Sequence, residues 1–365
     1  MNRKALVPAL ILGIAAFSSC SKSSDNGGIT TPFTTVETQV TTSFVNSTAI
    51  PQYDSLSKAG TALNTAINNL VATPTDANLL IAQTAWKKMR LFWERTEGFL
   101  IGPVEEQDYD PNTDTWPTDY QQMDALLAGS NPLNLSDVQS LDPTLRGYHP
   151  IEYLIFGKGG SRKASELDAR KIKYLNSLTA DLEANVQALH DSWTTGGGSS
   201  YAQKILTAGP GNTTYASKQA FFIVLAGAVA DICNEVGQQN ENGKMFNPFS
   251  TKDSTLAESP YSGNSLIDFK NNIIGAQQVY LGYNGGKGLK DLVAAKNKDL
   301  DTKIQAAISA AVNSFDNISG ADNMRFEVAI TQRRTQIQTT MDLLNTLQAL
   351  LENDLVNFIK TNVKD

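Results

Sequence analysis

The chain has 365 residues, 41% hydrophobic and 18% charged, which is apolar enough to bury real cores and excludes a disordered protein. At about 150 residues per domain, this length suggests two domains or one long repetitive domain. The formal net charge of −7 leaves no basic field for phosphates, so we expect no nucleic acid partner. Two cysteines and two histidines exclude a disulfide scaffold and cysteine-rich zinc modules, so most ligands of any bound metal must be oxygen atoms.

The N-terminus has the pattern of an export signal. Two basic residues precede an apolar run over 5–17 that is too short to span a membrane, and two serines and Cys20 follow it. Small residues before a cysteine resemble a bacterial lipobox, in which the cysteine is diacylated; an ordinary cleaved signal is the alternative. We therefore expect a signal peptide over 1–19, lipidation at Cys20 and a flexible tether over 20–35. The expected location is the cell envelope, anchored to the outer membrane or at the periplasmic face.

Beyond the tether, apolar residues recur at intervals of three and four, with no strand-like alternation of useful length. This spacing predicts helices throughout. Four apolar stripes are each wide enough to pack against two or three other helices, as in a bundle. They run over 79–93, 172–193, 222–236 and 337–358.

Glycines at 196–198 interrupt the helical pattern directly after the second stripe. They predict a seam between an N-terminal bundle over 36–195 and a C-terminal bundle over 196–365. Two further stretches, 102–118 and 237–260, are rich in residues that favour irregular structure, and we expect long loops there. Loops of this length in a helical protein often carry function.

The segment that begins at Gly147 could carry chemistry. Pro150 is tolerated in a first helical turn, so a short helix should start here. His149 and Glu152 are three residues apart and project from about the same side. The pair can ligate one metal, or Glu152 can orient the imidazole as a base. The simpler alternative is that Glu152 bonds the ring or caps the helix.

A second acidic cluster lies upstream. Glu97 follows Trp93 by four residues and falls on the buried stripe, where a carboxylate needs a partner or must take up a proton. Glu94 has a plainer explanation, because Arg90 precedes it by four and the two could form a solvated ion pair. Asp114 lies in an acidic loop, where it would form an Asx turn or supply a further oxygen ligand.

Together these residues resemble the imelysin-like family, first described through an insulin-cleaving metallopeptidase. Gly147, His149 and Glu152 match its Gly-x-His-x-x-Glu signature. The segments 86–103, 114–117 and 258–282 are similar to three other motifs of the family in the same order. The resemblance covers most of the chain from about residue 40 to the end.

The resemblance implies an all-α fold of two related helical bundles, with a possible internal duplication and the signature near their junction. Family members are typically exported or anchored bacterial proteins, some associated with iron supply. A related domain occurs in iron-uptake proteins, where His-x-x-Glu is thought to bind metal. The implied partners are the membrane, through Cys20, and iron-uptake or other envelope proteins.

The first of three candidate functions is metal binding by a lipid-anchored protein in iron acquisition. A hard cation would be held by one imidazole and several carboxylates, namely His149, Glu152, Glu97, Glu94 and Asp114. Iron is the favoured ion and zinc the alternative, and the metal can be absent from the purified protein. Supporting residues are expected around it: Gly147, Tyr148, Ser262, Asp268 and Asn272. For the last two, solvent exposure is the alternative.

The second candidate is a metallopeptidase in which Glu152 or Glu97 activates a metal-bound water. The chain has no His-Glu-x-x-His motif, so a third ligand would have to come from Asp114 or Asp268. The third candidate is a pocket for an organic ligand such as a haem, a siderophore or a peptide. Its expected aromatic walls are Trp93, Trp116, Tyr148 and Tyr153.

Overall fold

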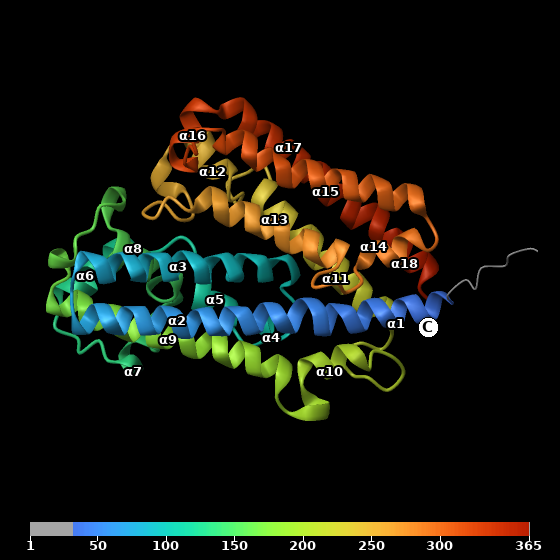
Figure 1. Ribbon diagram of the computed structural model, residues 1–365, viewed down its shortest axis with the longest axis horizontal. Coiled ribbons are helices and arrows are strands. Elements are labelled where there is room, and N and C mark those ends of the chain that lie inside the picture. The colour runs from blue at the N-terminus through green and yellow to red at the C-terminus, as the bar shows by residue number, and fades with distance from the viewer. Residues whose placement is uncertain (1–31, 365) are drawn as a thin grey trace, which may run out of the picture. The chain divides into compact units, whose positions relative to one another are not determined.

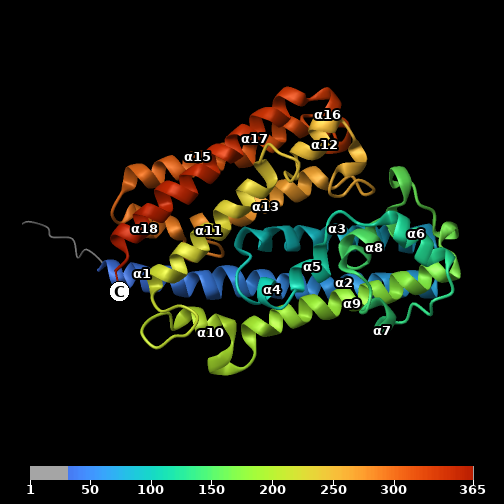
Figure 2. The ribbon, with the colours of Figure 1, turned by 180° about the vertical axis from the view of Figure 1, so that it is seen from behind.

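A continuous helical rod opens the part of the chain that the structure describes, residues 32–364 of a computed structural model. It consists of α1 (Phe33–Ser43), the π-helical turn η1 (Phe44–Ala49) and α2 (Ile50–Ala72). The rod runs the length of the molecule in both ribbon views (Figures 1 and 2). Because α1 begins at Phe33, the last three residues of the predicted tether are helical. The predicted signal peptide and Cys20, the predicted lipidation site, lie outside the described residues.

The N-terminal half is built on three long helices. α2 packs against α3 (Asp76–Thr96) and α9 (Ala169–Thr194), whose apolar stripes are buried as the spacing predicts. Short helices and 3-10 turns connect α3 to α9: η2 (Glu97–Phe99), α4 (Pro103–Glu106), α5 (Tyr109–Asp114), α6 (Tyr120–Ala128), α7 (Leu135–Val138), η3 (Pro143–Leu145), α8 (Tyr148–Phe156), η4 (Lys158–Gly160) and η5 (Ala164–Glu166). The predicted loop over 102–118 therefore contains two helices, which are too short to show a helical period.

The C-terminal half packs four longer helices against one another, α11 (Lys218–Gly237), α13 (Ser265–Leu281), α15 (Lys298–Ser319) and α17 (Arg334–Ala349). The last continues through a π-helical turn, η8 (Leu350–Leu355), into α18 (Val356–Asn362). The smaller elements are η6 (Gly197–Ser199), α10 (Tyr201–Leu206), α12 (Phe246–Thr251), η7 (Ser254–Leu256), α14 (Leu289–Ala294) and α16 (Phe326–Gln332). α12 and η7 lie within 237–260, so this stretch also is not the long irregular loop expected.

No strand occurs in residues 32–364, and the all-α prediction is confirmed. α11 is long and apolar enough to cross a membrane by composition, but it packs against α13, α17 and α18 as a core helix. α1 contacts α14 of the C-terminal half, so the rod joins the two halves. Residues 33–365 cluster as one compact unit. The boundary at 195/196 and the internal duplication remain predictions.

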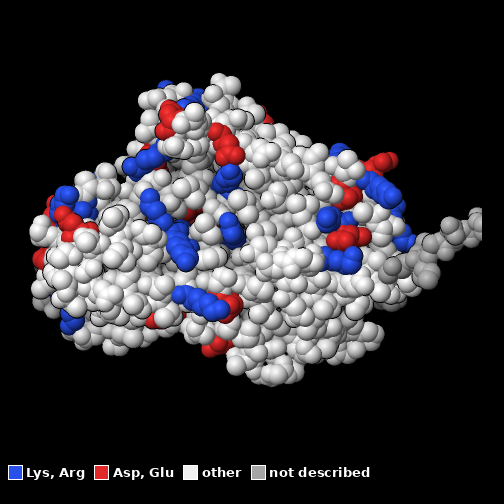
Figure 3. Space-filling view, viewed as in Figure 1, with Lys and Arg blue, Asp and Glu red and all other residues white. Residues whose placement is uncertain are grey.

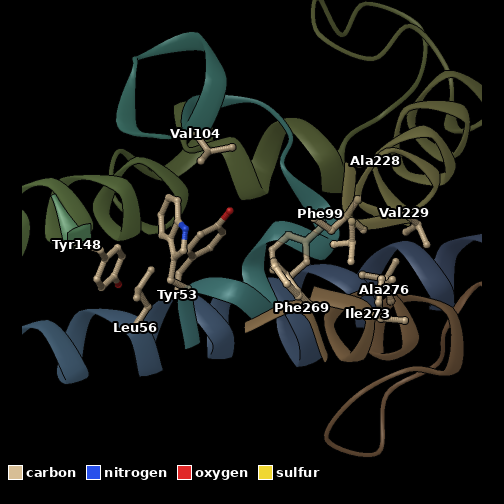
Figure 4. Close-up of a cluster of buried hydrophobic side chains, with 14 of the residues drawn as sticks. Tyr53, Leu56, Phe99, Val104, Tyr148, Ala228, Val229, Phe269, Ile273 and Ala276 are labelled. Carbon is tan, nitrogen blue, oxygen red and sulfur yellow. The ribbon is translucent and has the colours of Figure 1, made fainter. Parts of the chain in front are cut away.

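The contact between the halves that positions the site lies where α13 crosses α3 and η2. A Cβ on Gly98 would lie 2.4 Å from the backbone nitrogen of Ala276, and one on Gly275 would lie 2.2 Å from the backbone oxygen of Arg95. The two backbones therefore touch. Figure 4 shows Phe99 beside α13 side chains that include Ile273. This close approach sets the acidic end of α3 against the polar face of α13.

Gly275→Ala is expected to lower the free energy of unfolding by about 1–3 kcal/mol, because the new methyl group would force α3 and α13 apart. Urea denaturation measures this. The matched control is Gly227→Ala in the middle of α11, where an added Cβ meets nothing within 4 Å. There alanine is expected to stabilise the helix by about 0.5–1 kcal/mol. Equal effects at the two glycines would contradict the backbone contact.

Candidate functional site

The signature helix α8 is held against the end of α5 by a glycine. Gly147 has a φ of 77°, and a Cβ there would lie 2.1 Å from the backbone oxygen of Thr113. A larger residue would be strained and would collide. Because the two segments approach this closely, Nε2 of His149 lies 3.1 Å from Oδ1 of Asp114, the last residue of α5. Trp86 adds a hydrogen bond to the backbone oxygen of Tyr148.

The imidazole of His149 is buried and has no aligned hydrogen bond. Its side chain is 1% exposed, and Nδ1 lies 3.8 Å from Oε2 of Glu152. Neither ring nitrogen, nor this carboxylate oxygen, has a hydrogen-bond partner of good geometry among the described residues. The other oxygen of Glu152 accepts the backbone N–H of Ser262 at 2.7 Å. Glu152 thus connects α8 to the segment before α13. None of the roles expected for it, as a metal ligand, a partner of the imidazole or a helix cap, included this connection.

Charge around His149 favours its protonated form. Burial lowers the pKa of the imidazole, but the carboxylates of Asp114 and Glu152 outweigh burial and raise it to about 9. Burial would raise the pKa of Asp114, yet Arg90 and His149 hold it well below its ordinary value. Without a bound metal ion, the pair is therefore an imidazolium beside a carboxylate.

Arg90 stands at the centre of the acidic cluster. Its guanidinium, which is fully buried, contacts Asp114 and lies 2.5 Å from Glu94, 3.1 Å from Glu258 and 3.8 Å from Asp268. The predicted pair with Glu94 exists but is not solvated, because α13 and the segment before it cover this face of α3. Desolvation makes the pair depend on close contacts on every side.

Glu97 takes the partnered position that its place on the buried stripe requires. Its Oε1 accepts the indole N–H of Trp93 at 2.9 Å, and its Oε2 accepts the amide of Asn272 at 2.7 Å. The same amide donates to Oε2 of Glu94 at 2.5 Å, and the same indole donates to Asp114 at 2.7 Å. Trp93 is therefore a donor to carboxylates and not the wall of an organic pocket.

Asp268 lies in the first turn of α13 and is fully buried. Its oxygens accept the hydroxyl of Ser259 at 2.6 Å and the amide of Asn264 at 2.5 Å. Burial raises its pKa to about 7, against the opposing effect of Arg90. Asn272 is fully buried as well, so the alternative of solvent exposure is wrong for both residues.

Sequence reasoning missed the second permanent cation, Lys244. Its ammonium lies 3.1 Å from Glu97, 2.9 Å from Glu258 and 3.0 Å from Glu235. It comes from the loop after α11, which shows no helical period, and no local motif marks it. Glu258 is the first residue of the family motif over 258–282, but the sequence did not identify it as a site residue. Its position beside both Arg90 and Lys244 depends on the fold.

Two sets of carboxylate oxygens lie close enough to share one metal ion. Within each set the ligand atoms are all within 4.8 Å of one another: Glu94, Glu97 and Asp114 form one, and Glu94, Glu258 and Asp268 the other. Burial raises the pKa of Glu94 and of Glu97. With Glu152 there are six carboxylates against three positive groups, Arg90, Lys244 and the imidazolium of His149, so negative charge is in formal surplus.

A cavity of about 330 Å³ leads to the first set from outside. Glu97, Asp114, Trp116 and Lys244 line it, and the ring of Trp116 lies 5.2 Å from that of His149. Of the four aromatic residues expected to wall an organic pocket, only Trp116 lines this cavity. Tyr148 is fully buried, and the centroid of its ring lies 5.1 Å from the guanidinium carbon of Arg90. The face of the molecule shown in Figure 3 carries charges in small scattered groups. Most of the acidic cluster is buried in the interior.

Three tyrosine rings pack together, and burial, with the nearby charge of Glu152, raises the pKa of two of them, Tyr120 and Tyr261. The rings of Tyr120, Tyr153 and Tyr261 have centroids 5.0–5.2 Å apart, which leaves no room between them. The Tyr153 hydroxyl donates to Asp124, an exposed residue of α6, at 3.1 Å. The site thus opens to the cavity at Trp116 and Lys244, while the three tyrosines form a packed cluster that does not line this cavity.

The family model for imelysin (peptidase M75) matches residues 49–351. The chain belongs to the imelysin family. It is 30% identical over 248 residues to iron-regulated protein A of Synechococcus elongatus, an alignment that covers 68% of this chain and 65% of the relative's length. The four family motifs identified in the sequence lie within the matched range.

Two solved structures share the fold. A protein described as an iron-regulated protein A precursor from Parabacteroides distasonis matches with a TM-score of 0.80 and 24% identity, covering 90% of this chain and 95% of that one. An imelysin-like protein from Psychrobacter arcticum matches with a TM-score of 0.68 and 12% identity, covering 89% and 96%. At these identities the likeness establishes the imelysin-like fold. The metal role of the site residues stays a prediction.

His149 should make the metal-free protein's stability depend on alkaline pH. Its pKa rises from 6.5 to about 9 on folding, so its stabilising contribution is complete below about pH 6.5 and lost as pH rises through about 9. The loss is at most about 3 kcal/mol, since each tenfold change in proton affinity is worth about 1.4 kcal/mol. Urea denaturation from pH 6 to 10 should show a smaller loss in His149→Gln, whereas His190→Gln should follow the wild type. Identical profiles for all three proteins would refute the His149 contribution.

Proposed function

We propose that this imelysin-family protein binds a hard metal cation, with iron favoured and zinc the alternative, as a lipid-anchored protein of the cell envelope. The observation that carries the proposal is a fully buried imidazole without an aligned partner, set among carboxylates that outnumber the nearby permanent cations. Such a surplus is costly in a low dielectric unless protons or further cations offset it. A multivalent cation supplies the missing positive charge.

The donor set fits such an ion. Hard cations prefer carboxylate oxygens at about 2.0–2.6 Å, so oxygens within 4.8 Å of one another can reach a common ion. Glu97 and Asp114 line the cavity, and Glu94 completes their set. Neither nitrogen of His149 belongs to either set of ligand atoms, but its Nε2 lies 3.1 Å from Oδ1 of Asp114. In the proposed site the ring would shift onto the ion and add a nitrogen ligand, which iron and zinc accept and magnesium rarely takes. Asn272 and Trp93 would orient the carboxylates through their N–H groups.

A peptidase role is less well supported by the arrangement. A general base for hydrolysis must reach a water that also contacts the substrate. Of the two expected bases, Glu152 is not among the residues that line the cavity. Glu97 lines it, but its oxygens already pair with Trp93, Asn272 and Lys244, and it belongs to the first oxygen set. The cavity is also small for a haem or a siderophore, since pockets for organic ligands range from about 300 to 1,000 Å³.

Export, lipidation at Cys20 and a role in iron acquisition are part of the proposal. They are supported by the N-terminal pattern and by the names of two relatives, both described as iron-regulated protein A. Partners would be the membrane, through the lipid, and iron-uptake or other envelope proteins.

Metal binding can be measured by anaerobic titration of the mature protein with Fe²⁺ and separately with Zn²⁺. Saturable binding at one site is expected for the wild type. His149→Ala should weaken it at least tenfold, because the ion loses a ligand. His190→Ala is the matched control at the other histidine, which lies 3.0 Å from Asp191 near the end of α9, and should bind as the wild type does. Absence of saturable binding, or equal effects of the two alanines, would overturn the proposal.

A cleavage assay separates this function from the peptidase. The metal-loaded protein, incubated with insulin chains or casein, is expected to leave them intact. Cleavage that disappears in Glu152→Gln would establish the peptidase instead. Cleavage that persists in that variant would indicate a contaminating enzyme.

A further inference from the structure

Lys244 is placed by a short, well-anchored turn between α11 and α12. Its backbone N–H donates to the backbone oxygen of Glu235 at 3.0 Å, and the backbone N–H of Met245 donates to the backbone oxygen of Val236 at 3.4 Å. Met245 is fully buried, and a Cβ on Gly243 would lie 2.0 Å from the backbone oxygen of Gln238. The turn is therefore fixed on both sides of Lys244, and the side chain is directed at the acidic cluster.

The ammonium of Lys244 touches both oxygen sets. Glu97 belongs to the first set and Glu258 to the second, and each lies about 3 Å from Nζ, at 3.1 and 2.9 Å. The third partner, Glu235, is different. Its side chain is 46% exposed, so it lies at the outer end of the cavity, which it also lines. The ammonium thus stands between the inner carboxylates and an outer one.

The two cations of the cluster differ in how easily each could leave. Arg90 is fully buried and held by four carboxylates and the ring of Tyr148. Lys244 lies at the cavity, with its side chain 11% exposed, and has a flexible four-carbon stem. If its ammonium swings outward, Glu235 can still pair with it. Lys244 could therefore leave Glu97 and Glu258 without losing every partner of its own, whereas each of the four carboxylates that pair with Arg90 is buried and none could follow it outward.

We propose that Lys244 is a tethered counter-ion that occupies the mouth of the acidic site, and that an entering multivalent cation exchanges with it. The inference rests on the metal-binding function proposed above. Lys244 then sets a threshold: a monovalent ion brings no more charge than the ammonium it displaces, whereas a divalent or trivalent ion brings more. Lys244 is in this sense an affinity-determining and charge-selecting residue, and Glu235 is the outer partner that receives it.

The test compares metal affinity in three charge variants. Lys244→Met is expected to bind Zn²⁺ and Fe²⁺ at least tenfold more tightly than the wild type, by competition with a chromophoric chelator. Lys88→Met removes the same charge from an exposed position on α3 and should leave affinity unchanged. Lys244→Arg keeps the charge and should stay near the wild type. Metal-free Lys244→Met should melt at a lower temperature than the wild type, and metal should raise its Tm by more.

A second variant keeps the proposal testable if Lys244→Met does not fold. Glu235→Gln removes the outer partner, so a displaced ammonium would be left unpaired, and metal affinity should fall several-fold. If the wild type binds metal while folded Lys244→Met binds it equally or more weakly, Lys244 is only a structural ion pair and the inference fails alone. If neither the wild type nor Lys244→Met binds either metal, the proposed function fails and the inference with it.

Discussion

The burial of one guanidinium among carboxylates from four segments is the interaction on which the rest of the structure depends. Arg90 of α3 holds Glu94 of its own helix, Asp114 of α5, Glu258 after η7 and Asp268 of α13. Breaking such a pair leaves a charge uncompensated in a low dielectric, at a cost of about 3–5 kcal/mol. Each segment is therefore held near Arg90 by electrostatics, while the touching backbones at Gly98 and Gly275 fix the distance between the halves.

The helices that could be predicted from the sequence are long ones that bury one face and expose the other. The stripes over 79–93, 172–193, 222–236 and 337–358 lie in α3, α9, α11 and the helical run from α17 to α18, because a helix in a bundle buries every third or fourth residue. α4, α5 and α12 span one or two turns each, which is too short for a period to emerge, and tertiary contacts decide their conformation. The π-helical turns η1 and η8 could not be predicted either, because the apolar spacing continues through them.

The site was predictable where chemistry and spacing were local. His149, Glu152, Glu97, Glu94 and Asp114 do come together in a chain of contacts, because the i, i+3 pair on α8 faces the end of α5 and the buried stripe of α3 carries its carboxylate inward. Arg90 was visible only as the local partner of Glu94, and Lys244 was not visible at all. Their roles depend on residues more than a hundred positions away, which no local pattern encodes.

The metal-free protein offsets its surplus of negative charge by three means at once. Burial raises the pKa of Glu94, Glu97 and Asp268, so protons neutralise part of the cluster. Arg90 and Lys244 supply fixed positive charge, and amide and indole N–H groups take up the remaining lone pairs. A metal bound as proposed would act on the same charges as the protons and the Lys244 ammonium, and it would have to displace some of them. Its affinity would then be the free energy of binding the ion less the free energy of releasing those groups, so the displaceable groups would matter as much as the ligands.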